Sequence, residues 1–311
     1  MYDVVALGEL LIDFTCRSTD GEGYPVMEAH PGGAPANFLA AVAKLGGSAA
    51  MLGKVGDDAF GRLLTDTLRT CGIETRGIVA DPKVFTTLAF VTLDARGERE
   101  FSFARKPGAD TCLSAGELAL SLIDGAREFH FGSLSLTDEP VREATRCAVA
   151  RAKAGGALIS FDPNLRRALW RSLAEAKEQM LWGLSQADVV KLSEEEAEFL
   201  FGLAPERAAA QILERFGAQV VFVTCGAEGS YFASRRASGA VPAAQGICAV
   251  DTTGAGDIFG GCAVKKLIDS GRRPEELSGE ELREITAFAN RVAGLSTTRA
   301  GGISSLRGLS L

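Results

Sequence analysis

Residues 250–261 form the stretch of sequence that says most about the fold, and they read Val250-Asp251-Thr252-Thr253-Gly254-Ala255-Gly256-Asp257-Ile258-Phe259-Gly260-Gly261. The small residues in this stretch lead into a pattern typical of a helix that ends near Ser270. The first N–H groups of a helix have no intrahelical acceptor, and the helix dipole places positive charge at the same end. The amides of Gly254, Ala255 and Gly256 are therefore predicted to form an anion site that suits a phosphoryl group.

Asp257 follows this glycine turn, and its carboxylate has two interpretations. An aspartate at the start of a helix is commonly an N-cap that accepts backbone N–H groups. A carboxylate also repels the phosphate that it borders, so its presence beside an anion site calls for a chemical reason. That reason would be a general base that takes the proton from a substrate hydroxyl as the hydroxyl attacks a γ-phosphoryl group.

Apolar, β-branched runs alternate with stretches of helical period along most of the chain. The pattern predicts strands at 3–7, 49–52, 157–161, 188–192 and 219–224, and helices at 35–45, 139–153 and 173–184. Strands that alternate with helices are typical of a mainly parallel sheet with helices on both faces. The sequence therefore predicts an α/β fold.

One region departs from this alternation. The runs 87–93 and 99–105 are strand-like, and residues 94–98 between them carry a hairpin signal. Together with the segment 16–30, which has no regular pattern, they are interpreted as a small β flap that covers a site as a lid. A simple surface hairpin is the alternative interpretation.

Composition and charge exclude several classes of protein. The charge of 33 basic minus 40 acidic residues, −7, disfavours a partner such as nucleic acid, which needs a surplus of basic residues. Seven scattered cysteines without a CxxC pair indicate neither a zinc ribbon nor a disulfide framework. Only His30 and His130 are present, which disfavours a Ser-His-Asp hydrolase or a multi-histidine metal site. With no signal-like start and no apolar run of 18 residues, we expect a cytoplasmic protein without membrane contact.

A second glycine turn precedes the helix predicted at 35–45, in the sequence Pro31-Gly32-Gly33-Ala34-Pro35-Ala36-Asn37. Its backbone amides can approach a ligand closely, and Asn37 offers both a donor and an acceptor to a hydroxylated ligand. A solvated Asn at an ordinary helix start is the alternative. Two other glycine motifs are misleading: the stretch 52–55 lacks the first glycine and the Ser or Thr of a phosphate loop, and the stretch 226–229 is followed by a strand-like run instead of the helix of a dinucleotide site.

Taken together, the motifs closely resemble those of the ribokinase-like (PfkB) carbohydrate kinases, in order and over nearly the whole chain. They lie at 8–9 with Asp13, and at 32–37, 53–58, 162–166 and 251–257. Within that family the stretches 97–101, 129–133 and 191–196 look most like those of the fructokinases. The resemblance implies one domain over 1–311, a three-layer αβα sandwich, with lid strands from about 12–30 and 85–106.

The resemblance also implies a role for individual residues. Asp257 would be the general base, and Gly254, Ala255 and Gly256 would form the anion hole. Sugar contacts are implied for Asp13, Gly32, Gly33, Asn37 and Arg105, with Arg166 near the sugar or the phosphate. Nucleotide contacts are implied for Lys191, Glu196, Thr224, Gly226, Gly229 and Asn290. Glu196 would hold Mg²⁺ through water, and Asp251 would bind a potassium ion or, in the alternative interpretation, only form a turn.

The implied reaction is the transfer of the γ-phosphoryl group of ATP to a free hexose, with D-fructose and fructose 6-phosphate as the expected substrate and product. A 2-keto-3-deoxygluconate kinase, another sugar kinase of the family and a sugar sensor without catalysis are the alternatives. The resemblance also implies a homodimer formed through the lid. Two departures concern the substrate and the metal: Ala104-Arg105 replaces a frequent Tyr-Arg pair, and Ser193 replaces the Asn of Asn-x-x-Glu.

Overall fold

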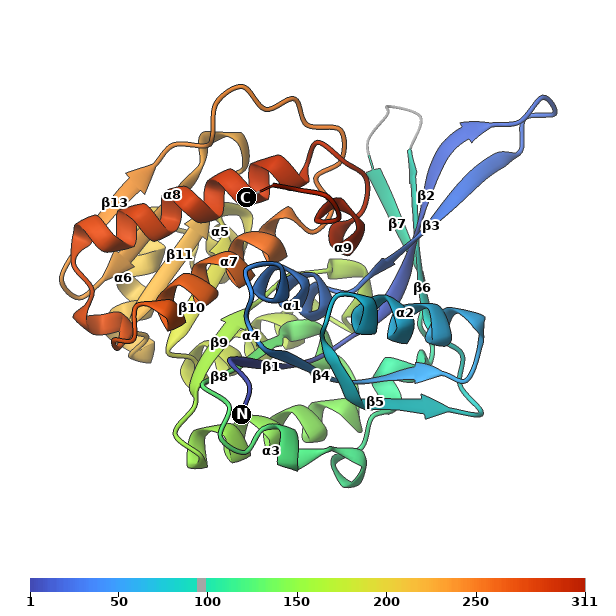
Figure 1. Cartoon of the computed structure of the whole chain (residues 1–311), viewed down its shortest axis with the longest axis horizontal. Coiled ribbons are helices and arrows are strands. Elements are labelled where there is room, and N and C mark those ends of the chain that lie inside the picture. Colours follow the sequence, from blue (N-terminus) through green and yellow to red (C-terminus); the bar gives the residue numbers. More distant parts are fainter. Residues whose placement is uncertain (94–98, 311) are drawn as a thin grey trace.

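A nine-stranded sheet forms the centre of the computed structural model, which describes residues 1–93 and 99–310 (Figure 1). Neighbouring strands from β5 to β11 pair in parallel, whereas β12 and β13 pair in antiparallel fashion at one edge. The order across the sheet is β13 (Ser238–Val241), β12 (Ser230–Ser234), β11 (Val220–Thr224), β10 (Val189–Ser193), β9 (Leu158–Asp162), β8 (Glu128–Gly132), β1 (Val4–Leu7), β4 (Ala49–Gly56) and β5 (Glu74–Asp81).

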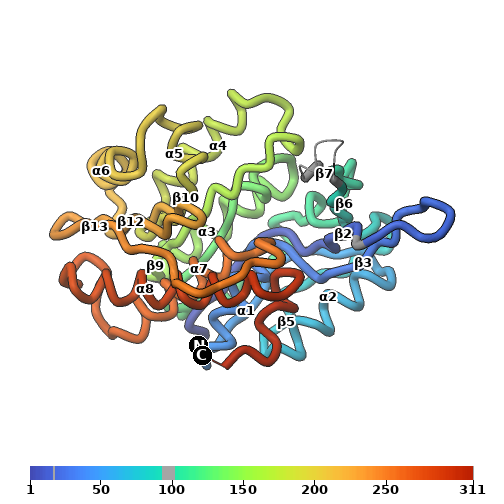
Figure 2. Tube along the Cα trace, turned by 90° about the horizontal axis from the view of Figure 1, so that it is seen from above, coloured from blue at the N-terminus to red at the C-terminus, as the bar shows by residue number. Residues whose placement is uncertain are grey.

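Helices cover both faces of this sheet, so the molecule has three layers (Figure 2). One face carries α1 (Ala34–Lys44), α2 (Ala59–Thr70), α7 (Ala255–Asp269) and α8 (Gly279–Ser296). The other face carries α3 (Val141–Ala154), α4 (Leu173–Gln186), α5 (Glu194–Phe201) and α6 (Pro205–Phe216). A short helix, α9 (Gly302–Ser305), follows α8. The α/β architecture predicted from the alternation of strands and helices is confirmed.

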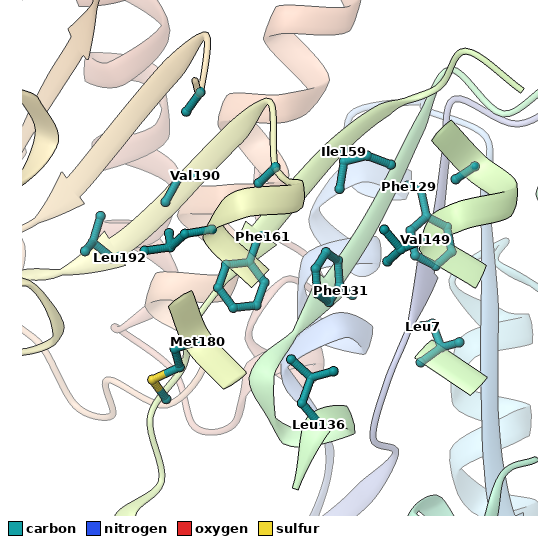
Figure 3. Close-up of a cluster of buried hydrophobic side chains, with 14 of the residues drawn as sticks. Leu7, Phe129, Phe131, Leu136, Val149, Ile159, Phe161, Met180, Val190 and Leu192 are labelled. Atoms are coloured by element: carbon teal, nitrogen blue, oxygen red, sulfur yellow. The ribbon is translucent and has the colours of Figure 1, made fainter. Parts of the chain in front are cut away.

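The alternation of side chains along β1 shows why the sheet needs two helical layers. Val4 and Ala6 belong to the apolar cluster under α1 and α7, whereas Val5 and Leu7 belong to the cluster under α3 and α4. All four residues of the strand are inaccessible to solvent. Figure 3 shows the second cluster, in which the rings of Phe131 and Phe161 lie with centroids 4.8 Å apart. A strand that is apolar on both faces is stable only between two layers.

A second sheet of four strands projects from one end of the large sheet (Figure 1). Its order is β3 (Pro25–Gly32), β2 (Leu11–Thr19), β6 (Thr87–Leu93) and β7 (Arg99–Ala104). The description of 16–30 as irregular was wrong, because β2 and β3 form an antiparallel hairpin through much of this segment. The strands are largely exposed around 18–28, so they lack the apolar alternation by which a strand is recognised. The turn predicted at 94–98 lies outside the described residues.

No helix in the described residues has the length and apolar character needed to cross a bilayer. The predicted single-domain organisation of 1–311, and the closing of the small sheet over a site, stay predictions.

Glu128, the first residue of β8, gives a prediction about stability. Its side chain is buried, and Oε1 has no hydrogen-bond partner in the part of the chain that the structure describes. Burial raises the pKa of the carboxyl group to about 8. The folded protein holds Glu128 protonated, whereas in the unfolded chain the carboxyl group ionises at its ordinary pKa. The free energy of unfolding therefore has its full contribution from Glu128 below that ordinary pKa, and this contribution is lost as the pH rises toward 8. Glu128→Gln cannot titrate, so its free energy of unfolding relative to the wild type should improve by roughly 3 kcal/mol between pH 4.5 and pH 7.

Urea unfolding at pH 5, 7 and 8 measures this difference, with the exposed Glu280→Gln as the control that should follow the wild type. Identical pH profiles for the wild type and Glu128→Gln would contradict the buried, protonated state of Glu128.

Candidate active site

The candidate site is centred on the turn at the start of α7. Gly254 is the N-cap of this helix and has a left-handed backbone with φ of 75°, a conformation that favours glycine. The Ala255 amide donates to the Thr252 carbonyl oxygen at 3.2 Å, so it completes the turn. Within the described residues, the amides of Gly254 and Gly256 have no acceptor. Two of the three amides predicted for the anion site are thus available to a ligand, whereas the third is engaged.

Asp257 occupies the third position of α7, whereas the N-cap is Gly254. Oδ2 instead accepts a hydrogen bond of 2.8 Å from Nδ2 of Asn37 on α1. Burial raises the pKa of Asp257 to about 6 and the nearby Asp162 carboxylate adds to the rise, while Lys191 and the hydrogen bond from Asn37 oppose it. A carboxylate with this pKa can accept a proton near neutral pH, which is the property a general base needs.

Asn37 packs against Gly254 at the start of α7 and against Gly302 at the start of α9. A Cβ atom on Gly254 would lie 2.9 Å from its Nδ2, and one on Gly302 would lie 2.1 Å from its Oδ1. Both positions therefore need glycine for the side chain of Asn37 to fit. Asn37 is only 3% exposed, and its Oδ1 has no hydrogen-bond donor among the described residues. A buried acceptor of this kind fits the hydroxyl of a ligand.

Asp13 reaches toward the same region from β2. A Cβ atom on Gly32 would lie 2.3 Å from Oδ2 of Asp13, so the glycine leaves room for the carboxylate. Burial raises the pKa of Asp13 to about 7, and the charges of Asp257 and Asp251 act in the same direction, while Arg166 lowers the pKa. The structure thus brings together Asp13, Asp257 and Arg166, which the sequence motifs place far apart. Arg166 itself is exposed and has room to move toward a ligand.

Lys191, on β10, places a cation beside the anion site. Its Nζ lies 2.9 Å from Oδ2 of Asp162, at the end of β9, and a Cβ atom on Gly256 would lie 2.8 Å from Nζ. The neighbouring carboxylates, first of all Asp162, raise the pKa of Lys191 against the effect of burial, so the side chain stays charged. Sequence reasoning missed Asp162 as a site residue, although its position at the carboxyl end of a buried strand is where such residues gather.

Glu196 forms a capping box with Ser193 at the start of α5. Its Oε2 accepts from the Ser193 amide at 2.8 Å, and its Oε1 accepts from the Leu165 amide at 2.7 Å. Ser193 therefore replaces the expected Asn as an ordinary N-cap. No group of three or more His, Cys, Asp or Glu side chains that could hold a metal ion exists within 1–93 and 99–310. Each carboxylate oxygen of Glu196 keeps a second lone pair, which fits a contact to a metal through water.

The predicted nucleotide residues surround the end of β11. Thr224 ends this strand, Gly226 has φ of 54°, and Gly229 has φ of 107°. Asn290 on α8 is buried, and its side chain joins the strand edge: Oδ1 accepts from Ser230 at 2.8 Å, while Nδ2 donates to the carbonyl oxygens of Val241 and Pro242. Asn290 is therefore not a solvated residue on the surface of its helix. Its contact with adenine stays a prediction.

The side chain of Arg105 is buried and only 2% exposed. Its guanidinium donates to Oδ2 of Asp110 at 2.8 Å, to Oγ1 of Thr137 at 2.9 Å and to the Leu134 carbonyl oxygen at 2.9 Å. These bonds give Arg105 a structural role that no sequence pattern indicated. The sugar contact implied by the resemblance stays a prediction.

Asp251 joins two loops beside the glycine turn. Oδ1 accepts from the amide and hydroxyl of Thr253 at 3.0 and 2.7 Å, and Oδ2 accepts from the Gly301 amide at 2.9 Å. The carboxylate therefore forms the turn proposed as the alternative to ion binding. A potassium ion at this place stays a prediction.

A groove of about 520 Å³ lies at the opposite, amino-terminal edge of the large sheet and is lined by several cations. Arg127 there donates to the carbonyl oxygen of Ile268, and Lys153 donates to that of Gln186. Cations at helix carboxyl ends satisfy carbonyl groups that have no intrahelical partner. The groove is thus explained by helix capping and does not compete with the glycine turns as a functional site.

Comparison with known proteins places this geometry in a family. A family model described as pfkB family carbohydrate kinase matches residues 1–308. Fructokinase-1 of Zea mays is 46% identical over 307 residues, which cover 97% of this chain and 94% of the maize protein.

Solved structures show the same architecture. Fructokinase from Xylella fastidiosa with bound ATP has a TM-score of 0.88 at 34% identity and covers 98% of this chain and 95% of its own. Fructokinase from Vibrio cholerae O395 with fructose, ADP and a calcium ion has a TM-score of 0.86 at 34% identity, covering 98% and 96% of the two chains. A double mutant of the latter enzyme holds fructose, ADP and a potassium ion, with a TM-score of 0.86 at 33% identity over 98% and 95%.

The hydrogen bond between Asn37 and Asp257 predicts how the Asp257 carboxyl group titrates. Asn37→Ala removes a donor that favours the ionised form, so the pKa of Asp257 should rise above its value of about 6. A ¹³C NMR titration of the Asp257 carboxyl carbon measures this change. Asn290→Ala, which removes a buried amide elsewhere, should leave the midpoint in place, and an unchanged midpoint in Asn37→Ala would refute the predicted coupling.

Proposed function

The chain belongs to the pfkB family of carbohydrate kinases, as its motifs predict, and on this premise we propose that it phosphorylates D-fructose with ATP to give fructose 6-phosphate. The observation that carries the reaction is the position of Asp257, a carboxylate with a pKa of about 6, beside the amides of Gly254 and Gly256, which have no acceptor among the described residues. The fructokinase named among the plant relatives, and the fructokinase structures with ATP or with fructose and ADP, support the substrates. A sugar sensor has no use for such a base.

In the proposed reaction, Asp257 accepts the proton of a fructose hydroxyl as its oxygen attacks the γ-phosphorus. The new O–P bond forms while the bond from phosphorus to the β–γ bridging oxygen breaks, and ADP leaves. The amides of Gly254 and Gly256 donate to the equatorial oxygens of the transferring group, and Lys191 supplies positive charge beside them. Asn37 orients the base through the bond to Oδ2.

The sugar is proposed to lie between the two glycine turns. Asp13 and Oδ1 of Asn37 would accept hydroxyl hydrogens, and the backbone at Gly32 and Gly33 lets the ligand approach closely. Arg166 would reach the sugar or the phosphate, because it is exposed and its charge acts on both Asp13 and Asp257. Arg105 would contribute by fixing the end of the small sheet.

ATP is proposed to bind along the edge formed by Thr224, Gly226 and Gly229, with Asn290 holding the neighbouring strands. The capping box leaves Glu196 suited to Mg²⁺ through water, not as a direct ligand. When bound with ATP, a divalent cation neutralises charge on the phosphate oxygens. The calcium ion in the Vibrio cholerae structure supports a divalent cation in this family.

We also propose a potassium ion beside Asp251, supported by the potassium ion in the structure of the Vibrio cholerae double mutant. Potassium accepts several oxygen ligands without strict geometry. The Asp251 carboxylate and carbonyl oxygens of the loops at 252–253 and 301–302 would supply them. Since Asp251 already links both loops, an ion here would stabilise the Gly254–Gly256 turn. A homodimer through the small sheet and a cytoplasmic location stay predictions.

A substrate panel tests the proposed function. With ATP and Mg²⁺, the purified protein should have its highest kcat/KM for D-fructose among fructose, 2-keto-3-deoxygluconate and ribose, measured as sugar-dependent release of ADP. Far better turnover of either other sugar would make the fructose assignment wrong and leave the kinase assignment intact. As the control for chemistry, Asp257→Asn keeps the size of the side chain but removes the proton acceptor, so kcat should fall by about 10²–10⁴-fold with little change in fructose binding.

The cation proposal has its own test. Replacing Na⁺ by K⁺ at constant ionic strength should raise the rate, because the ion orders the loop that carries the anion-binding amides. Asp251→Asn keeps an acceptor oxygen but lacks the charge, and it should respond equally to both salts. Equal rates for the unmodified enzyme in the two salts would show that the turn needs no ion.

A further inference from the structure

Glu9 is a buried carboxylate that the proposed reaction does not use. It lies between β1 and β2 and is 3% exposed. Its Oε1 accepts a hydrogen bond of 2.9 Å from the amide of Ala34, 25 residues further along the chain. Oε2 is buried and has no hydrogen-bond partner among the described residues. A carboxylate buried at this cost calls for a specific task.

The start of α1 shows what that task is. The N-cap of this helix is Gly33, which has no side chain to accept the first free amides. The second helical residue is Pro35, which has no N–H group at all. Ala34 therefore carries an amide that needs an acceptor, and Glu9 supplies it from another part of the chain. A carboxylate at a helix amino terminus is also favoured by the helix dipole.

Gly33 cannot be replaced by an ordinary capping residue. Its φ is 112°, and a Cβ atom on it would lie 2.3 Å from the backbone oxygen of Glu9. Ser, Thr, Asp or Asn at the N-cap would therefore clash with the same residue that now provides the cap. The backbone of Glu9 packs against the glycine turn while its side chain holds the first amide of the helix.

We infer that Glu9 is a positioning residue for the sugar site, acting as a remote N-cap that fixes the Gly32–Gly33 turn and the first turn of α1. This inference rests on the proposed function, because the turn faces the sugar only in that assignment. The fixed turn carries Asn37, whose side chain in turn holds Asp257. Glu9 thereby connects the first strand of the large sheet to the sugar contacts without touching the reacting atoms.

The charged surroundings of Glu9 suit a conservative replacement. Arg105 is close enough to lower the pKa of Glu9, whereas Asp110 and above all burial raise it, to about 7. Gln at position 9 keeps an oxygen that can accept the Ala34 amide, whereas Asp is shorter by one methylene group and cannot reach it.

Kinetics of Glu9→Ala, Glu9→Asp and Glu9→Gln test the inference. Glu9→Ala and Glu9→Asp should raise KM for fructose by about tenfold and lower kcat, because Asn37 also orients Asp257, with KM for ATP within threefold of the wild type. Glu9→Gln should restore KM for fructose and kcat to within threefold. Glu9→Asp keeps the charge and serves in place of Glu9→Ala if that variant does not fold. Ser172→Ala, which removes the N-cap of α4 on the other face of the sheet, is the matched control and should leave KM for fructose unchanged.

Amide hydrogen exchange of Ala34 supplies a readout that is independent of turnover, and it should be faster in Glu9→Ala and Glu9→Asp than in Glu9→Gln. An unchanged KM and unchanged exchange in a folded Glu9→Ala would overturn the inference, as would a Glu9→Gln variant as impaired as Glu9→Ala. Failure of the proposed function can be distinguished from failure of this inference. In that case the wild type itself would not phosphorylate fructose, while amide exchange of Ala34 would still be faster in Glu9→Ala than in the wild type.

Discussion

The close packing of α1 against α7 is the constraint on which the site depends. A Cβ atom on Gly261 of α7 would lie 2.3 Å from the backbone oxygen of Phe38 on α1, so only glycine permits this distance between the helices. At that distance Asn37 reaches Asp257 across 220 residues of sequence. The two glycine turns at the amino ends of these helices then face the same region. Any increase in the helix spacing would separate the base from the residue that orients it.

Electrostatics in the site follow from the burial of its carboxylates and from their proximity to one another. Asp13 lies near Asp251 and Asp257, and Asp257 lies near Asp162. The charge of Arg166 lowers the pKa of Asp13 and of Asp257, and Lys191 lowers that of Asp257. Burial and mutual repulsion raise the pKa values of Asp13 and Asp257 into the range of about 6 to 7. Charge on an entering phosphate would add to this repulsion. The two amides without acceptors and the ammonium group of Lys191 are therefore essential partners of the base, and not additions to it.

The layered fold and the glycine turns could be predicted from sequence, because apolar alternation and helix-start chemistry are local properties. The strands of the small sheet were harder to recognise: β2 and β3 extend into solvent, where no buried face imposes a pattern. The contacts between residues far apart in the sequence were not predicted, even where the residues themselves lay in a recognised motif. Glu9 accepts a hydrogen bond from the Ala34 amide, and Asp162 accepts one from Lys191. The spacing of these residues in the sequence does not indicate either contact. Arg105 matched a motif, yet its bonds to Asp110, Thr137 and Leu134 depend on tertiary packing alone.

The topology of the small sheet has a consequence for the order in which the chain folds. β2 pairs in parallel with β6, with Leu11 opposite Thr87, and α1, β4, α2 and β5 lie between them in the sequence. Parallel neighbours cannot be joined by a tight turn, so this pairing closes a long loop and bears its entropy. The β2–β3 hairpin can form early from local contacts, but the four-stranded sheet can be completed only after residues up to the end of β7 have left the ribosome. Completion of the small sheet therefore follows the hairpin, after the chain that contains α1, β4, α2 and β5 has been synthesised.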